Sequence, residues 1–287
     1  MKNHLFFFST DQNPSPFDIN IALDSGFDIV IPLSLVTEDT AEGLTHDVIF
    51  SRGPKGVKKS AIFVGGSDVA LAERIAAKAA ASMVPPFTAP VFCDPKGAYT
   101  TGAALVAKAH KAAGGLAGKR FLVFGGTGPV GGVTASLAAS EGAHAVIVTS
   151  RDKQAAQTAA DALSRKTGLK IYGEAARDEK ERLALMKESD IAAATVKAGV
   201  RVVSLAGLAS LERGLIVADL NAVPPAGFEG LEPHDEMKQI APNVRGIGAL
   251  AIGALKYKVE AGLFKAMLER GAGAGYIECY ELAKTLA

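Results

Sequence analysis

The residue types and spacing best suited to bind a charged cofactor lie in one glycine-rich segment near the middle of the chain. Four apolar residues, Phe121 to Phe124, lead into glycines, and a helix-compatible segment follows at 133–139. Gly126, Gly128 and Gly131 have the spacing of a dinucleotide-binding turn, where a helix amino terminus meets a pyrophosphate. A purely structural glycine-rich turn is the alternative. The predicted pyrophosphate contacts are Gly126, Thr127, Gly128, Pro129, Val130 and Gly131.

The next apolar segment, 145–148, ends in residues that bear on cofactor choice. An Asp or Glu at this place usually accepts the ribose 2′-hydroxyl of NAD. This chain has Ser150, Arg151 and Lys153 there, and a hydroxyl beside two cations suits a 2′-phosphate. Asp152 either caps the following helix or faces the ribose, and the two cations could instead be solvated loop residues. The pattern favours NADP, with NAD as the alternative.

Two further segments carry candidate substrate contacts. Lys256 follows the apolar run 246–255, so its ammonium is expected to be partly desolvated, although a lysine extending from a helix to solvent is the alternative. Thr100 and Thr101 lie between an expected strand and an expected helix. Either threonine caps that helix, or one hydroxyl points at a polar ligand.

The segment around Phe17 offers an aromatic ring and a carboxylate. Ser15 and Pro16 are typical of a helix start. Phe17 is then either a core residue or an aromatic wall for a flat heterocycle. Asp18 either compensates the helix dipole or contacts the substrate.

The elements that must position these residues alternate between strand and helix, which predicts an α/β fold with a largely parallel sheet. Strand ends would then meet at one edge, which adds Ala206 and Asn221 as candidate cofactor contacts. The expected strands are 4–8, 29–32, 60–64, 91–93, 121–124, 145–148, 170–172, 191–194, 202–205 and 216–219. The expected helices are 16–25, 69–82, 100–113, 133–139, 153–167, 178–188 and a final one at 249–270.

The length of 287 residues is expected to give two domains or one large one, and the glycines that follow residue 113 indicate a linker between two. We predict a substrate domain at 1–113 that 245–287 completes, and a nucleotide-binding Rossmann domain at 114–244. The last helix is expected to cross back to the first domain, so that both ends of the chain build it.

Composition excludes several classes. Thirty-one basic and 30 acidic residues nearly cancel, so neither nucleic acid nor an anionic membrane is an expected partner. Two cysteines and five histidines lack metal-ligand spacing, so no metal is expected. The apolar segment at the start of the sequence is too short for the core of a secretory signal, and no apolar segment is long enough to span a bilayer. A cytoplasmic protein is therefore expected. Sequence motifs of hydrolases and of nucleoside triphosphatases are absent.

Several short sequence motifs resemble those of one known family, the bacterial NAD(P)-dependent methylene-tetrahydromethanopterin dehydrogenases of one-carbon metabolism. The resemblance covers nearly the whole chain. The motifs are 15–20 (SPFDIN), 61–66 (AIFVGG), Gly97 with Thr100 and Thr101, 126–131 (GTGPVG), 219–225 (DLNAVPP) and 246–256 (GIGALAIGALK).

This resemblance implies a fold similar to methylene-tetrahydrofolate dehydrogenases and a homo-oligomer, a trimer or a multiple of one. It implies that Phe17 stacks near the pterin, that Thr101 contacts the substrate and that Lys256 is the central active-site lysine. Some members have a histidine four residues after that lysine. Glu260 stands there in this chain, where it is within reach of Lys256 along the helix.

The implied reaction is reversible hydride transfer from methylene-tetrahydromethanopterin to NADP⁺, which yields the methenyl pterin and NADPH. Arg151 resembles members restricted to NADP, whereas Tyr257 and the context 223–225 resemble members that also accept NAD. The alternatives are a methylene-tetrahydrofolate dehydrogenase, a non-catalytic NADPH-binding sensor and, less favoured, a reductase of the shikimate dehydrogenase type.

Overall fold

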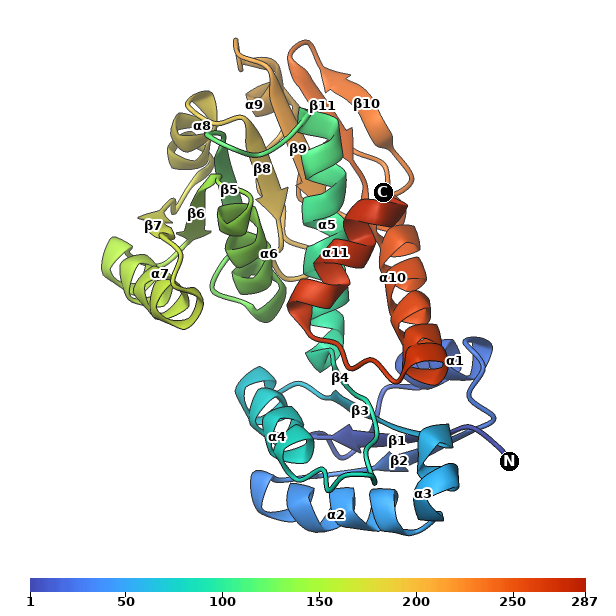
Figure 1. Cartoon of the computed structure of the whole chain (residues 1–287). Coiled ribbons are helices and arrows are strands. Elements are labelled where there is room, and N and C mark those ends of the chain that lie inside the picture. The colour runs from blue at the N-terminus through green and yellow to red at the C-terminus, as the bar shows by residue number, and fades with distance from the viewer. The chain divides into compact units, whose positions relative to one another are not determined.

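The computed structural model describes all residues, 1–287, and its elements form two compact units (Figure 1). Unit 1 contains residues 1–100, 257–282 and 286, and unit 2 contains residues 101–256, 283–285 and 287. The units therefore divide within two long helices, whereas the sequence analysis placed its boundaries at 113/114 and 244/245. None of the helices is both long and apolar enough to cross a bilayer.

Unit 1 is built on a four-stranded parallel sheet of order β2-β1-β3-β4. Every residue of β3 is buried, as expected for the interior of a parallel sheet covered on both faces. The strands are β1 (His4–Ser9), β2 (Ile29–Leu33), β3 (Ser60–Gly65) and β4 (Val91–Cys93). The helices are α1 (Pro16–Asp24), α2 (Glu38–Phe50), α3 (Gly53–Gly56) and α4 (Val69–Ala81), with single 3₁₀ turns at Val57–Lys59 and Pro95–Gly97.

An aromatic cluster forms the core of unit 1 and includes a residue from the far end of the chain. Phe63 on β3 lies 4.9 Å from Phe7 and 5.2 Å from Phe92, measured between ring centroids. Phe264 lies 5.3 Å from Phe63 and 5.4 Å from Phe92 in edge-on contacts. Such geometry stabilises buried aromatic pairs beyond their buried area. The carboxyl-terminal segment thus completes the first core.

Unit 2 contains a seven-stranded sheet of order β10-β11-β9-β8-β5-β6-β7, in which only β10 is antiparallel. The strands are β5 (Arg120–Phe124), β6 (His144–Thr149), β7 (Tyr172–Ala175), β8 (Ile191–Ala194), β9 (Leu215–Asp219), β10 (Glu236–Ala241) and β11 (Val244–Ile247). The helices are α6 (Pro129–Ser140), α7 (Lys153–Thr167), α8 (Glu179–Lys187) and α9 (Leu205–Ala209). The six parallel strands have the doubly wound order 3-2-1-4-5-6, counted from β5.

Three helices complete the chain: α5 (Ala98–Ala113), α10 (Ala249–Arg270) and α11 (Tyr276–Leu286). The division between units falls inside α5 and α10. In unit 2 the strand order turns in opposite directions on the two sides of β5. Ligands of such sheets bind in the crevice at the carboxyl ends of the strands at this switch point, here β5 and β8.

The α/β fold with parallel sheets is confirmed, and two predicted strands require correction. The predicted strand 202–205 is wrong, because Val203 makes only an isolated bridge to Phe228 and Ser204 caps α9. The strand predicted at 170–172 lies instead at Tyr172–Ala175. The helix at 249–270 has the predicted bounds but is not the last, because α11 follows. The elements that were not predicted are α2, α3, α9, α11, β10 and β11.

Candidate functional site

The β5–α6 turn forms a backbone cradle at the carboxyl edge of the second sheet. The tight turn is made by Gly125, whose φ is 79°, one residue before the predicted Gly126. A Cβ atom on Gly126 would lie 2.5 Å from the Cβ atom of Ile147, and one on Gly131 would lie 2.5 Å from the carbonyl oxygen of Gly125. Only glycine fits at these two positions, as a dinucleotide-binding turn requires.

The amino terminus of α6 is open toward this edge. Gly128 is its N-cap, no side chain caps its first amides, and Pro129 occupies the first turn. Uncapped amides at a helix amino terminus attract phosphate. Thr127 is exposed beside them, and Val130 is half-buried. The predicted residues 126–131 therefore fit a dinucleotide pyrophosphate.

A pocket of about 300 Å³ continues from this cradle along the carboxyl ends of the strands. Its walls come from the end of β5, the residues after β6, and the loop 196–202 after β8. Ser150 and Arg151, predicted from sequence, line it together with Arg182 of α8. The position beside the switch point and the size of the pocket suit the adenosine half of a dinucleotide.

Four cations and no carboxylate line this pocket. The side chains of Arg151 and Lys197 make no ion pair or hydrogen bond within the chain. Arg182 donates to the carbonyl oxygens of Val202 (3.0 Å) and Arg177 (3.3 Å), which ties two walls together. Arg201 pairs with Glu229 at 2.6 Å. The unpaired cations make the pocket attractive to an anion.

The two other residues predicted after β6 have different surroundings. Asp152 is the N-cap of α7, and its side chain accepts a hydrogen bond of 2.8 Å from the amide of Ala155, so the capping alternative is the one observed. Lys153 pairs with Glu174 at 3.2 Å and is not among the residues that line the pocket. Glu174 lies on β7, and the sequence around Lys153 alone does not predict this ion pair.

The loop after β9 is organised by a buried carboxylate. Asp219 is 2% exposed and accepts hydrogen bonds from the amides of Asn221 (2.9 Å), Gly227 (2.6 Å) and Phe228 (3.3 Å). Burial raises the pKa of its carboxyl group, and the three amide donors act in the opposite direction. Asn221 in turn donates to the carbonyl oxygen of Pro225 at 2.7 Å. Asn221 follows the strand end as predicted, within a separate pocket of about 260 Å³.

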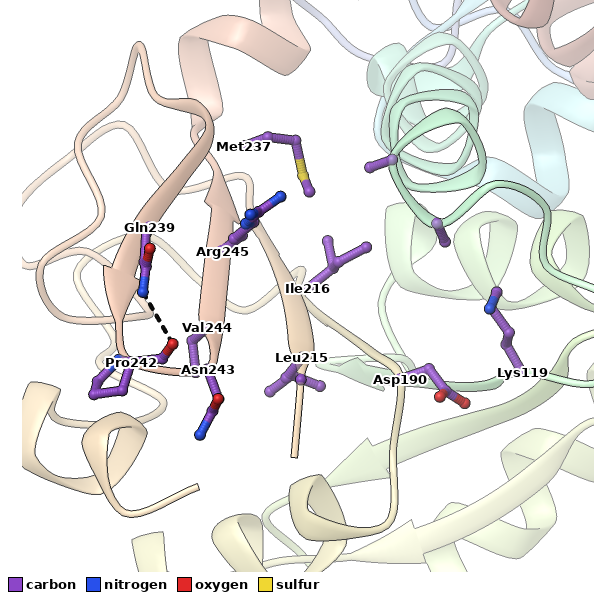
Figure 2. Close-up of a pocket in the computed structure, with 13 residues that line it drawn as sticks. Lys119, Asp190, Leu215, Ile216, Met237, Gln239, Pro242, Asn243, Val244 and Arg245 are labelled. Atoms are coloured by element: carbon purple, nitrogen blue, oxygen red, sulfur yellow. Dashed lines mark hydrogen bonds between the residues drawn. The ribbon is translucent and has the colours of Figure 1, made fainter. Parts of the chain in front are cut away.

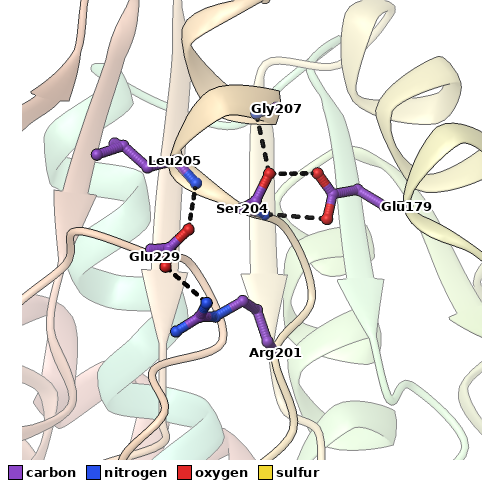
Figure 3. A network of polar contacts seen from close by, with 6 residues as sticks. All are labelled: Glu179, Arg201, Ser204, Leu205, Gly207 and Glu229. Carbon is purple, nitrogen blue, oxygen red and sulfur yellow. Dashed lines mark hydrogen bonds and ion pairs between the residues drawn. The ribbon is translucent and has the colours of Figure 1, made fainter.

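A polar network holds the wall of the nucleotide pocket around α9 (Figure 3). Ser204 donates to Glu179 at 2.5 Å and accepts from the amide of Gly207 at 3.1 Å. The carboxylate of Glu229 accepts a hydrogen bond from the Arg201 guanidinium and one of 2.8 Å from the amide of Leu205. The network therefore fixes the direction of the Arg201 guanidinium.

Ala206 lies on the exposed surface of α9. Its prediction as a cofactor contact assumed a strand at 202–205, and that strand does not form.

In unit 1, Phe17 and Asp18 occupy the first turn of α1. Ser15 caps this helix as expected, because its hydroxyl accepts from the amide of Asp18 at 3.3 Å. Phe17 is 55% exposed, so it is not a core residue. Asp18 is only 6% exposed.

The helix start near Thr100 is capped by an aspartate. Asp94 accepts from the amides of Tyr99 (2.8 Å) and Thr100 (3.3 Å) and from the Thr100 hydroxyl (2.5 Å). Neither threonine is therefore the cap. The hydroxyl of Thr100 is used internally, whereas Thr101 is half-buried in the first turn of α5.

Lys256 and Glu260 lie one turn apart on the same face of α10. Lys256 is 7% exposed, so it does not extend to solvent, and Glu260 is fully buried. Lysine and glutamate are rarely buried to this extent unless they are paired or have a functional role. This burial agrees with the desolvation expected for Lys256.

Comparison with known proteins bears on the family. The family profile described as methylene-tetrahydromethanopterin dehydrogenase, N-terminal, matches residues 16–96. The NAD(P)-dependent methylenetetrahydromethanopterin dehydrogenase of Methylorubrum extorquens is 37% identical over 265 residues, which cover 90% of this chain and 89% of that protein. The chain belongs to the methylene-tetrahydromethanopterin dehydrogenase family. The resemblance predicted from the sequence motifs is thus confirmed.

Two further comparisons extend over nearly the whole chain. The bifunctional protein MdtA of the same organism is 35% identical over 288 residues, which cover 100% of this chain and 99% of that protein. The solved methylenetetrahydrofolate dehydrogenase-cyclohydrolase of Trypanosoma brucei has a TM-score of 0.52 and 14% identity, and covers 94% of this chain and 87% of that one. The latter likeness concerns the fold alone, and it agrees with the predicted architecture.

Sequence reasoning missed three cations of the nucleotide pocket in this dehydrogenase: Arg182, Lys197 and Arg201. Lys197 and Arg201 follow β8, the strand beside β5 at the switch point. The rule that ligands meet the carboxyl ends of these strands would have found both. Arg182 enters from a helix, and only the tertiary structure places it.

Proposed function

We propose that this family member oxidises methylene-tetrahydromethanopterin with NADP⁺ as the hydride acceptor. Family membership supports the reaction, because a relative that covers most of the chain has that name. The cationic pocket at the carboxyl edge of the second sheet supports the cofactor. That pocket is the observation on which the choice of NADP over NAD depends.

The proposed chemistry is the transfer of one hydride. The hydrogen would leave the methylene carbon together with its bonding electron pair, and C4 of the bound nicotinamide would accept both. The remaining cation is shared by the two flanking nitrogens of the methenyl product. No proton has to be moved, so the residues of this chain act mainly by holding two rings in register and by excluding water.

Each part of the cofactor has proposed contacts. The backbone at 126–131 binds the pyrophosphate, and Asn221 contributes from the end of β9. Ser150 and Arg151 bind the 2′-phosphate, because a guanidinium with no partner in the chain can give charge-assisted hydrogen bonds to it. Lys153 is already paired with Glu174 and is expected to add less.

The substrate contacts are proposed from the resemblance together with burial. Phe17 stacks on the pterin, and its exposed ring supports this role. Thr101 and Asp18 make polar contacts to the substrate. Lys256 orients the substrate and adjusts its electrostatics rather than acting as a base, since the hydride step releases no proton. Glu260, one turn away, is proposed to set the charge state around Lys256.

The remaining proposals concern organisation. We assign 1–113 with 245–287 to the substrate domain and 114–244 to the NADP-binding domain. Cys93 and Cys279 are both buried and neither is part of a disulfide, as is usual in a reducing compartment, which supports a cytoplasmic location. A homo-oligomer, a trimer or a multiple of one, stays a prediction of the resemblance, and light scattering of the purified protein tests it.

The test is a spectrophotometric assay of nicotinamide reduction with purified protein. Methylene-tetrahydromethanopterin and methylene-tetrahydrofolate are each offered with NADP⁺ and with NAD⁺. Rapid reduction of NADP⁺ with the methanopterin substrate alone is expected. Equal use of NAD⁺ would preserve the reaction and overturn the proposed role of Arg151.

Two other outcomes would change the reaction itself. Preferred turnover of the folate substrate would assign the chain to folate chemistry. Tight NADPH binding without turnover of either pterin would make the chain a nucleotide sensor.

A further inference from the structure

A third pocket lies at the opposite, amino-terminal edge of the sheet in unit 2 (Figure 2). Its walls include residues that precede or open four strands: Lys119 before β5, Asp190 before β8, Leu215 on β9 and Val244 on β11. Its volume is about 560 Å³, within the range of small-molecule sites. It shares no lining residue with the nucleotide pocket.

The charge balance of this pocket is positive. Its one carboxylate, Asp190, is already neutralised, because it pairs with Arg213 at 2.5 Å and accepts from the amide of Arg120 at 2.9 Å. The side chains of Lys119 and Arg245 line the pocket and have neither an ion pair nor a hydrogen bond within the chain. Two cations that converge on one cavity without a counter-charge favour an anionic occupant.

The surface between these cations is apolar. Figure 2 shows Ile216 between Arg245 and Lys119. Ala112 and Ala113, at the end of α5, also line the pocket. On the opposite wall, Gln239 and Asn243 use their amide nitrogens to donate to backbone carbonyls at 2.9 and 3.0 Å. Their side-chain oxygens are left as hydrogen-bond acceptors. The pocket therefore suits an apolar body that carries an anionic group.

Met237 forms part of the upper wall through an irregular backbone. It has a φ of 57°, a conformation that non-glycine residues seldom adopt, and it lies at a register shift between β10 and β11. Bulges of this kind redirect a side chain out of the ladder. The thioether of Met237 thereby reaches the pocket, where a flexible, polarisable side chain adapts to an apolar ligand.

From the cavity, its two uncompensated cations and its apolar wall, we infer that this pocket binds an amphiphilic organic anion. The anion is a carboxylate, sulfonate or phosphate monoester attached to an aliphatic or aromatic body. Its charge meets Lys119 and Arg245, and its body lies against Ile216 and Met237. The site is separate from the nucleotide pocket, so the anion and NADP⁺ bind at the same time.

The test uses the whole protein and anilinonaphthalene sulfonate, a fluorescent aromatic anion. Fluorescence is titrated in the presence of saturating NADP⁺, which is not fluorescent and occupies the nucleotide pocket. Saturable binding with a stoichiometry of one is expected. Replacing both cations, Lys119→Ser with Arg245→Ser, is expected to raise the dissociation constant of the probe by about tenfold or more.

Two matched variants keep the test specific. Ala113→Leu fills the cavity without changing charge and is expected to weaken the probe as well. Lys238→Ala removes a cation from the same hairpin outside the pocket and is expected to change nothing. Unaltered NADP⁺ affinity shows that each variant is folded. Failure of the probe to bind when NADP⁺ is saturating, or equal probe affinity in all variants, would overturn the proposal.

Inorganic phosphate serves as a competitor to separate charge from shape. Phenyl phosphate is expected to displace the probe at a concentration at least about tenfold lower than inorganic phosphate, because only the ester also covers the apolar wall. Equal potency of the two would show that the cations attract any anion, and would overturn the amphiphilic class.

Discussion

At the residue scale, the proposed preference for NADP rests on the few side chains that follow β6 and β8. The side chains of Arg151 and Lys197 make no ion pair or hydrogen bond within the chain, whereas Lys153 and Arg201 are paired with Glu174 and Glu229. An unpaired cation can give its full hydrogen-bonding capacity to a phosphate. A paired one must first exchange its partner.

Arg151→Ala is expected to lower kcat/KM for NADP⁺ by roughly 10- to 100-fold, the loss of one or two hydrogen bonds to a charged group. The value for NAD⁺ should change little, because NAD⁺ has no 2′-phosphate. Steady-state kinetics with both cofactors measures this. Lys153→Ala is the matched control, and a loss as large as that of Arg151→Ala would contradict the assignment.

Lys256→Met keeps the apolar stem and removes the charge. If Lys256 orients the substrate, kcat should fall by about a hundredfold, the usual effect of misplacing reacting groups. The KM for NADP⁺ should stay within about twofold, because the cofactor pocket is unchanged. Lys258→Met on the exposed face of α10 is the control. Full activity of Lys256→Met would rule out the proposed role.

At the scale of elements, buried or half-buried carboxylates tie the loops that follow parallel strands. Asp11, after β1, accepts two hydrogen bonds of 3.0 Å from the amide of Ser67 and one of 2.6 Å from its hydroxyl. Asp219 does the same for the loop after β9. A carboxylate therefore anchors one loop at the carboxyl edge of each sheet, and in the loop after β9 it acts together with the apolar packing of Phe228.

Asp11→Asn is expected to lower the free energy of unfolding by about 1 kcal/mol at neutral pH. The hydrogen bonds from Ser67 place the pKa of the folded Asp11 carboxyl below its ordinary value of 3.8. Its stabilisation is therefore complete above that pH and is lost as pH falls through the lower folded-state pKa. Urea unfolding at several pH values measures this. The difference from wild type should shrink in acid, and Asp47→Asn, an exposed change on α2, is the control.

Asp219→Asn replaces one acceptor oxygen by an amide donor that faces backbone N–H groups. The expected cost is about 1–3 kcal/mol, typical of a buried donor left without a partner. Because the anchored loop contains Asn221, the KM for NADP⁺ should rise as well. Urea unfolding and kinetics measure both effects. Glu212→Gln, an exposed change just before β9, is the control, and a stability equal to wild type in Asp219→Asn would refute the anchoring role.

At the scale of the whole molecule, the chain is divided into two units with separate sheets and separate cores. The aromatic cluster of unit 1 draws in Phe264 from the carboxyl-terminal part of the chain. The core of unit 2 is formed by apolar residues on its strands and neighbouring loops, such as Leu122, Val217 and Phe228. A ligand that contacts only unit 2 should therefore stabilise the two units unequally.

Hydrogen exchange with NADP⁺ at about a hundred times its dissociation constant tests this expectation. Linkage predicts that exchange through global opening of unit 2 slows by about a hundredfold. The protection should be clearest at 125–131 and 196–202, and the smallest effect is expected in the strands of unit 1. Uniform protection throughout both units would show instead that they open as one cooperative body.

Sequence patterns predicted the elements whose signals are local. The helix 153–167 follows an N-cap aspartate and ends before a left-handed glycine, and its bounds are those of α7. The helix 249–270 was equally well delimited. The antiparallel hairpin of β10 and β11 was missed, because its burial alternates irregularly and its register shifts twice. The strand at 202–205 was predicted from apolar character alone, although Ser204 begins a helix.

The sequence by itself determined the α/β alternation and the glycine turn, because caps, glycine spacing and hydrophobic periodicity act within a few residues of one another. The family was recognised separately, from the resemblance of several motifs along the chain. Only the tertiary structure decided which cations serve the nucleotide pocket. Lys153 is drawn to Glu174 on a neighbouring strand, and Arg182 enters from α8. The tertiary structure also brings Lys119 and Arg245, which are far apart in the sequence, into the pocket at the amino-terminal edge of the sheet. Such groupings depend on strand order, and strand order is set by long-range packing that no local pattern encodes.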